Sequence, residues 1–215
     1  MGTTSRGQAP AEIVERGYDA VAERYLDWSA GSKLRERWLE DLRPHLPLRA
    51  KVLDLGCGAG VPVAKLLSDG GSDVLGVDLS PRQIELARSH VPTAEFREGD
   101  IASIDFETGS FDAVVALYSI THVPRALHQE LFNRVYRWLV PGGVFLASLG
   151  TRDLPAWTGE WLGTTMFFSH FDAPTNLRLL ERAGLTILKQ EIVGEHEHGQ
   201  PVEFLWVEAV RPLAE

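Results

Sequence analysis

A run of alternating glycines beside a carboxylate is the pattern in this sequence that best suits ligand binding. The apolar stretch Val52–Leu55 runs directly into Gly56, Gly58 and Gly60. Glycines at a strand-to-helix turn allow a tight turn and let a ligand lie against bare backbone. Asp54 lies two residues before the first glycine, where its carboxylate would repel a diphosphate and attract an amino group. The turn therefore predicts a ligand with a cationic end.

Two further carboxylates follow the next two apolar stretches. Asp78 ends the stretch Asp73–Val77, and Asp100 follows Ala94–Arg97. An acid about 20 residues beyond the glycines accepts the ribose hydroxyls in dinucleotide-binding folds. Asp100 could accept a hydrogen bond from an adenine amino group while Ile101 packs on the ring. A lone strand-end aspartate is often only a cap or a loop charge, but successive strand ends meet at the edge where such sheets bind ligands.

A nicotinamide-dinucleotide site is the main alternative for the glycine turn. That site favours the spacing G-x-G-x-x-G, which would place the third glycine where this chain has Val61. Val61 and Asp54 therefore disfavour an NAD-dependent oxidoreductase. A tight turn without any ligand is the remaining alternative.

The elements expected around these residues alternate between strands and helices. Residues 11–45 show helical spacing that breaks once, which predicts two helices. Strands that alternate with helices build a parallel sheet with helices on both faces, because each crossover returns to the same edge. The expected strands are Lys51–Leu55, Asp73–Val77, Ala94–Arg97, Phe111–Leu117 and Val144–Leu149, and the later helices are Val61–Ser68, Pro81–Ser89, Arg125–Leu139 and Pro174–Ala183.

The last third of the chain breaks this alternation. Leu185–Val193 and Val202–Val210 read as strands, and residues 194–201 between them are too few for a helical crossover. They should pair as an antiparallel hairpin. Gly150–Phe171 lacks clear periodicity yet is rich in aromatic residues. We expect an irregular segment that covers a substrate, and a contribution to the ordinary core stays open.

Composition argues against several classes of function. The net charge is -9, and acidic and basic residues are equal in number over residues 1–50. The sequence therefore shows no basic stripe that could bind nucleic acid. No apolar run has the length of a bilayer and no leader pattern opens the chain, so we expect no membrane partner. A single cysteine, Cys57, indicates the cytoplasm. A chain of 215 residues suits one domain, with residues 1–10 as a flexible tail.

These motifs resemble the class I S-adenosylmethionine-dependent methyltransferases, in their small-molecule branch, over nearly the whole chain. VLDLGCGAG at 52–60 resembles their first motif, VLGVDLS at 74–80 their ribose-binding motif and EGDI at 98–101 their adenine-binding motif. FDAVVALYSITHVP at 111–124 resembles their fourth strand, and the strand that begins PGGVFLAS at 141–148 resembles their fifth.

The resemblance implies a three-layer, Rossmann-like α/β sandwich. Its seven-stranded, mostly parallel sheet has the order 3-2-1-4-5-7-6 with strand 7 antiparallel, in agreement with the terminal hairpin. Residues 11–45 would cap the cofactor site, with Tyr18 or Tyr25 near the methionine carboxylate, although simple packing is as good an explanation for either tyrosine. Residues 150–171 would be a substrate-covering insertion. The residues implied to bind the cofactor are Tyr18, Tyr25, Asp54, Gly56, Cys57, Gly58, Asp78, Leu79, Gln83, Asp100, Ile101, Leu117 and Tyr118.

The implied activity is methyl transfer from S-adenosylmethionine to a small-molecule acceptor, which leaves S-adenosylhomocysteine. Transfer from a sulfonium is an in-line displacement that needs the acceptor held close and water excluded. The oxygen, nitrogen or carbon acceptor is expected to be apolar or aromatic. A non-catalytic sensor or scaffold that binds the same cofactor is the alternative. The sequence does not indicate an oligomeric state.

Two histidines are candidates for catalysis, because an acceptor that loses a proton needs a base. His122 follows the fourth strand, and His170 ends the aromatic segment. A turn cap and simple packing, respectively, explain them equally well or better. The run Glu195–His198 alternates acids with imidazoles, as a metal site on an extended chain would. We interpret it as a solvated hairpin loop and expect no metal.

Overall fold

The computed structural model describes residues 9–197 and 200–213. Most of the predicted flexible tail, residues 1–8, lies outside the described residues, and Pro10 already begins a helix. Helix α1 (Pro10–Ser29) is followed by α2 (Lys33–Leu42), whose first turn is capped by Ser32 because the hydroxyl accepts a hydrogen bond from the amide of Arg35.

Seven strands form the main sheet, in the order β3-β2-β1-β4-β5-β9-β8. Pairing is parallel from β3 to β5, whereas β9 is antiparallel to both of its neighbours. This confirms the predicted order, with β9 and β8 as strands 7 and 6. The strands are β1 (Lys51–Leu55), β2 (Asp73–Asp78), β3 (Glu95–Glu98), β4 (Phe111–Ala116), β5 (Leu139–Gly150), β8 (Thr186–Glu197) and β9 (Gln200–Val210).

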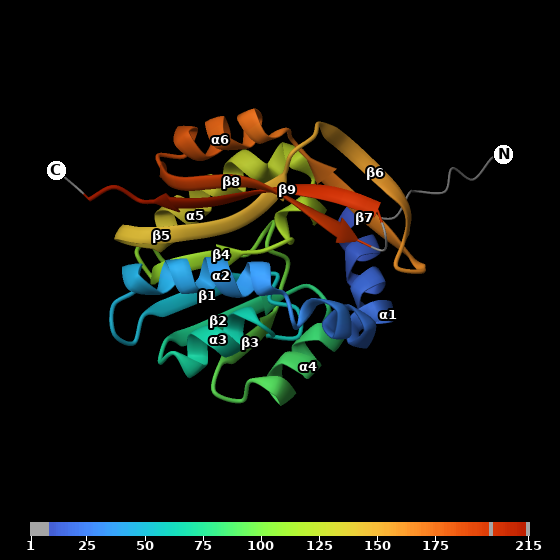
Figure 1. Cartoon of the computed structure of the whole chain (residues 1–215), viewed down its shortest axis with the longest axis horizontal. Helices are drawn as coiled ribbons and strands as arrows, with labels where there is room; N and C mark the ends of the chain where they lie inside the picture. The colour runs from blue at the N-terminus through green and yellow to red at the C-terminus, as the bar shows by residue number, and fades with distance from the viewer. Residues whose placement is uncertain (1–8, 198–199, 214–215) are drawn as a thin grey trace.

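Helices cover both faces of this sheet, as the prediction required (Figure 1). Alternate residues of each strand point to opposite faces, so Val52 packs with α2 and its neighbours while Leu53 packs on the side of α5 and α6. The remaining helices are α3 (Val63–Asp69), α4 (Pro81–His90), α5 (His128–Trp138) and α6 (Ala173–Arg182), with short 3-10 turns η1 (Arg43–His45), η2 (Ile120–His122) and η3 (Arg125–Leu127).

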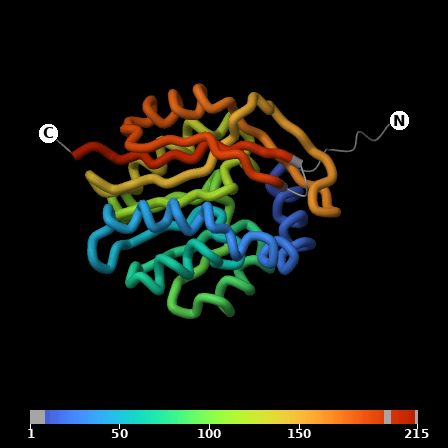
Figure 2. The backbone as a smooth tube through the Cα atoms, viewed as in Figure 1, coloured from blue at the N-terminus to red at the C-terminus, as the bar shows by residue number. Residues whose placement is uncertain are grey.

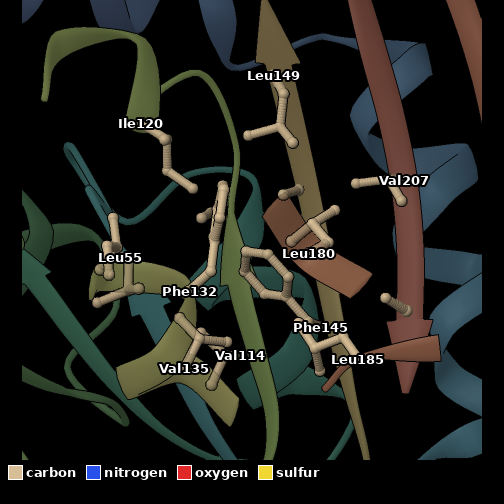
Figure 3. Close-up of a cluster of buried hydrophobic side chains, with 14 of the residues drawn as sticks. Leu55, Val114, Ile120, Phe132, Val135, Phe145, Leu149, Leu180, Leu185 and Val207 are labelled. Atoms are coloured by element: carbon tan, nitrogen blue, oxygen red, sulfur yellow. The ribbon is translucent and has the colours of Figure 1, made fainter. Parts of the chain in front are cut away.

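The core under α5 and α6 fixes the strand ends that carry the site. Figure 3 shows Phe132 from α5 and Phe145 from β5 facing one another between Val114 and Leu180. All four side chains are fully buried, and each such burial stabilises the fold by roughly 1.5–3 kcal/mol. Ile120 of η2 belongs to the same cluster, so this core also holds the segment after β4 in place.

The segment after β5 is a hairpin, and the predicted irregular structure is wrong. Strands β6 (Leu154–Trp161) and β7 (Thr164–His170) pair antiparallel as a separate two-stranded sheet. The turn is made by Leu162 and Gly163, both at positive φ. One edge and face of β6 are exposed, so its sequence need not alternate as a half-buried strand would. The β6–β7 hairpin lies beside α1 before the chain returns to α6 (Figure 2).

The terminal hairpin is longer than predicted. Strand β8 continues to Glu197 and β9 begins at Gln200, so most of the expected loop at 194–201 is strand. Glu195 is therefore in a ladder and not in a solvated loop, and His198 lies outside the described residues. Within the described part of the chain, no helix combines the length and apolar content needed to cross a bilayer.

Candidate functional site

One cavity, called the main cavity below because it holds most of the predicted residues, is lined by residues at the carboxyl ends of β1, β2 and β4 and by residues of α1. Figure 1 shows α1 beside this edge of the sheet. Parallel strands bring successive strand ends to one edge, so residues far apart in the sequence meet there. Most of the residues predicted to form a site line this cavity: Tyr18, Tyr25, Gly56, Gly58, Asp78, Leu79, Asp100, Ile101, Leu117, Tyr118 and His122.

The glycine turn between β1 and α3 requires glycine for steric reasons. Gly56 and Gly58 have φ values of 75° and 52°, which glycine adopts without strain. A Cβ on Gly56 would lie 2.3 Å from the Cβ of Ser119. The amide of Gly56 donates to the carbonyl of Val77 at 2.7 Å, and that of Gly58 donates to Asp78 Oδ2 at 2.8 Å. The turn is thus tied to the end of β2.

Asp78 is held rigidly at the cavity wall. Its Oδ2 accepts from Gly58 and its Oδ1 accepts from the amide of Ser80 at 2.9 Å. Burial raises the pKa of the Asp78 carboxyl to about 6, against the opposing effect of these amide donors. A preorganised carboxylate in such a position can accept hydrogen bonds from a vicinal diol.

Asp54 and Arg35 face a second, small cavity that adjoins the main one and shares Tyr25 and Gly56 with it. Asp54 is 1% exposed, and its Oδ2 has no hydrogen-bond partner. Burial raises its pKa to about 8, the charge of Asp78 adds to the shift, and the Arg35 guanidinium opposes it. Buried polar atoms are normally paired, so this oxygen fits a ligand that carries an amino group.

Arg35 is the site residue that sequence reasoning missed. Its Nη2 donates to the hydroxyl of Tyr25 at 3.1 Å, and its guanidinium carbon lies 4.5 Å from the ring centre of Tyr118. Its Nε is buried without a partner. A guanidinium with a spare donor suits a carboxylate. The signal was available, because Arg35 lies on the helix face that also buries Trp38, Leu39 and Leu42.

Helix α1 is held over the main cavity by polar contacts with the start of α4. Asp19 accepts from the hydroxyl of Ser80 at 2.5 Å and from the amide of Arg82 at 3.2 Å. Arg82 Nε also donates to Glu23 at 2.9 Å. On its other side α1 packs against β7, where Val14 joins a small apolar cluster with Met166. The helix therefore bridges α4 and the hairpin.

Tyr18 and His122 are in direct contact inside the main cavity. The Tyr18 hydroxyl lies 2.9 Å from His122 Nε2, and His122 Nδ1 lies 2.8 Å from the carbonyl oxygen of Phe167. A carbonyl can only accept, so Nδ1 carries the proton and Nε2 accepts from Tyr18. Burial lowers the pKa of His122 to about 4, which keeps the imidazole neutral near pH 7.

Besides Asp54, three of the predicted residues do not line the main cavity. His170 faces a separate cleft, and its Nδ1 lies 2.7 Å from the carbonyl oxygen of Arg152. Gln83 is fully buried next to Gly58, with neither amide atom paired. Cys57 lines the small cavity, where burial raises the pKa of its thiol.

An outer cleft of about 660 Å³ lies between the β6–β7 hairpin and the start of β9. Aromatic side chains from both elements form its walls: Trp157, Trp161, Phe168 and Phe204. Among residues 9–197 and 200–213, no group of three or more acidic, histidine or cysteine side chains could hold a metal ion.

The fold and the main cavity define a Rossmann-like protein that binds a nucleoside joined to an amino acid. Acids suited to a ribose and an adenine lie on one side of the glycine turn, and partners for an amino and a carboxylate group lie on the other. A methyltransferase-domain family model matches residues 52–143.

Similar proteins agree with this class. An uncharacterized methyltransferase from Synechocystis sp. is 30% identical, over 66% of this chain and 69% of its own length. The 27-O-demethylrifamycin SV methyltransferase of Amycolatopsis mediterranei is 32% identical, over 62% of this chain and just 56% of its own length. The 1,6-didemethyltoxoflavin-N1-methyltransferase of Burkholderia thailandensis, solved with S-adenosylhomocysteine, has the same fold, with a TM-score of 0.74, 21% identity and coverage of 98% and 93% of the two chains.

The chain belongs to the class I S-adenosylmethionine-dependent methyltransferase family, and its cofactor is S-adenosylmethionine.

Proposed function

We propose that this protein transfers the methyl group of S-adenosylmethionine to a small-molecule acceptor, chiefly by holding the two in line. The observation that carries the proposal is the arrangement of its cavities. The outer cleft adjoins the main cavity, because His122 lines the cavity while its neighbour Thr121 lines the cleft. An acceptor at this junction would lie close to the cofactor, and an in-line displacement needs that proximity.

Each part of the cofactor has a proposed partner. Asp78 accepts the ribose hydroxyls, while Asp100 and Ile101 take the adenine between them. Asp54 pairs with the amino group, and Arg35 takes the carboxylate. The glycine backbone and the remaining cavity residues complete the proposed site: Tyr18, Tyr25, Gly56, Cys57, Gly58, Leu79, Gln83, Leu117 and Tyr118.

The two histidines receive different proposed roles. When bound, the cofactor supplies a methyl group activated by a sulfonium. The protein therefore needs mainly to position the acceptor, and needs to activate it much less. The pKa of His122, lowered to about 4 by burial, makes it a weak base near pH 7. We infer that His122 serves in its neutral form, where it accepts the Tyr18 hydrogen bond and holds that hydroxyl at the cavity. His170, in the outer cleft, is proposed to contact the acceptor.

The surroundings support a small, apolar or aromatic acceptor. The relative named for 27-O-demethylrifamycin SV acts on a small molecule, and the cleft walls are aromatic. In this proposal residues 11–45 serve as the cap of a single methyltransferase domain and residues 150–171 as the substrate-covering insertion. The cytoplasmic location stays a prediction.

Calorimetry with S-adenosylhomocysteine tests the cofactor half of the proposal. Asp78→Ala should weaken binding by at least about tenfold, because it removes charge-assisted hydrogen bonds worth roughly 1.5–3 kcal/mol. Asp69→Ala, at an exposed aspartate that pairs with Lys65, is the matched control and should bind normally. Equal affinity in both variants would refute the ribose role.

Incubation with methyl-labelled cofactor and a metabolite extract tests the transfer. The wild type should label a small molecule, and Asp78→Ala should lose that labelling together with binding. A protein that binds the cofactor tightly yet labels nothing across a range of extracts would be a sensor or scaffold, and the proposed activity would be wrong.

A further inference from the structure

Tyr118 follows β4 in a backbone conformation that residues with a side chain rarely adopt. Its φ is 61°, in the left-handed region where glycine is the common residue. Its amide donates to Ser148 Oγ at 2.7 Å. Its ring packs edge-to-face against Phe204 and Trp206 of β9, with ring centres 4.7 Å and 5.6 Å apart. Such a conformation persists only where the surrounding structure holds it, and it is common at functional sites.

The side chain of Tyr118 contacts charged groups from two other elements. Its hydroxyl donates a hydrogen bond to Glu195 Oε2 of β8. Burial, together with this bond to a carboxylate, raises the pKa of the phenol, so Tyr118 keeps its proton. The Arg35 guanidinium of α2 lies over the ring, with its carbon 4.5 Å from the ring centre. Because a phenol that donates to a carboxylate is polarised, its ring attracts a cation more strongly.

Arg35 lies where the amino-acid end of the cofactor is proposed to bind. It lines the small cavity together with Asp54, and its buried Nε has no partner. Its Nη2 donates to the hydroxyl of Tyr25, so Tyr25 holds one nitrogen while the ring of Tyr118 holds the group as a whole. An arginine loses much rotamer freedom when it is fixed. Partners that fix its guanidinium in advance therefore strengthen its binding of a carboxylate.

We propose that Glu195 is a positioning residue for the cofactor: it holds Tyr118, which in turn holds the Arg35 guanidinium toward the cofactor carboxylate. The inference rests on the proposed function, in which Arg35 takes that carboxylate. Glu195 lines neither the main cavity nor the small one, so its action on the cofactor is indirect. A hydrogen bond that only fastened the terminal hairpin would not distinguish one part of the ligand from another.

Three ligands that differ only at the amino-acid end test the proposal by calorimetry. S-adenosylhomocysteine carries an amino group and a carboxylate, its decarboxylated analogue keeps the amino group, and 5′-methylthioadenosine has neither. Glu195→Ala should weaken S-adenosylhomocysteine binding about fivefold or more, because the guanidinium is no longer held for the carboxylate. The other two ligands should bind with affinities unchanged within about twofold. Glu195→Gln keeps an acceptor for the Tyr118 hydroxyl and should restore most of the lost affinity.

Two further variants test the route from β8 to α2. Tyr118→Phe keeps the ring and removes the hydroxyl, so it should act like Glu195→Ala. Combining the two substitutions should cost no more affinity than either one alone, because both break the same link. Glu191→Ala is the matched control, because Glu191 also joins β8 to α2, through an exposed ion pair with Arg37. This control should bind all three ligands normally.

Arg35→Gln separates failure of this inference from failure of the proposed function. Equal losses for all three ligands in Glu195→Ala, or an unchanged affinity for S-adenosylhomocysteine, would overturn the positioning role. If Arg35→Gln weakens S-adenosylhomocysteine alone while Glu195→Ala does not, only the role of Glu195 is wrong. If Arg35→Gln leaves the preference for S-adenosylhomocysteine over 5′-methylthioadenosine intact, the proposed place of the carboxylate is wrong as well.

Discussion

The acids beside the glycine turn behave differently from aspartates in water. Asp54 lies in a pocket without a partner for one oxygen, and burial raises its pKa to about 8. Asp78, with two amide donors, has a pKa raised only to about 6. The difference follows from hydrogen bonding, because amide donors stabilise the charged form that burial disfavours.

This difference predicts how stability depends on pH. The unfolded chain loses the Asp54 proton near pH 4, whereas the folded protein without cofactor keeps it to about pH 8. The folded state thus holds the extra proton between these values, so stability falls as pH rises through that window. Relative to Asp54→Asn, which cannot titrate, the wild type should lose at least about 1 kcal/mol of unfolding free energy between pH 5 and pH 9.

Urea unfolding of both proteins at the two pH values measures this loss. Because Asp78 titrates in both, its contribution largely cancels in the difference. If the unfolding free energies of the wild type and of Asp54→Asn change equally between the two pH values, the Asp54 carboxyl ionises normally.

Spacing along the chain revealed some of these residues and not others. Asp54 and Asp78 lie at the ends of strands and Asp100 follows one. Because parallel strand ends converge, the sequence was sufficient to place them together. Arg35 comes from a helix before the sheet, and only its position among apolar residues on that helix marks it. Gln83 is buried beneath the turn, a fact that depends on packing and that no spacing rule contains.

At the scale of elements, strands and helices with one buried side were predictable and the β6–β7 hairpin was not. Its turn places Leu162 at φ 52°, where asparagine is the usual residue, so Gly163 alone carries the turn signal in the sequence. The hairpin derives its stability from packing on α1 through Met166 and Phe167. A structure that depends on a partner far away in sequence leaves little local pattern.

The close contact between α1 and this hairpin predicts the effect of adding one methyl group at Gly17. At Gly17 an added Cβ would lie 2.7 Å from Met166 Cε and 2.9 Å from the carbonyl oxygen of Thr165. Gly17→Ala raises intrinsic helix propensity by about 1 kcal/mol, yet it should push α1 off β7 and weaken S-adenosylhomocysteine binding about tenfold by calorimetry.

Gly31 provides the matched control, because nothing lies within 4 Å of a Cβ there. Gly31→Ala should keep full affinity. If Gly17→Ala binds as well as the control, α1 and β7 are free to adjust and the contact does not position the cap.

At the scale of the whole molecule, the order of the strands was predictable from the resemblance to the methyltransferase family, and the terminal hairpin expected from the sequence agreed with it. Sequence could not show how the main cavity meets the outer cleft. That junction brings together Tyr18 of α1, His122 of η2 and Phe168 of β7, whose relative positions depend on how the cap and the hairpin pack.

The cap and the hairpin should therefore respond together to the cofactor. Helix α1 reaches the rest of the protein through the exposed ion pair of Glu23 with Arg82, through side-chain hydrogen bonds of Asp19, Tyr18 and Tyr25, and through its contact with β7. Exposed pairs contribute only about 0.2–1 kcal/mol each, so α1 should open locally more often than the core does.

S-adenosylhomocysteine in the main cavity would lie directly beneath α1 and close to β7. Hydrogen–deuterium exchange should slow by at least about tenfold over 10–29 and 164–170 when it binds. Exchange over 173–182, in α6 on the far side of the sheet, should stay unchanged, because that helix reaches the cofactor only through the buried core. Protection spread evenly over α6 and α1 would instead mean that the ligand stabilises the protein globally and that the cap does not move as a separate unit.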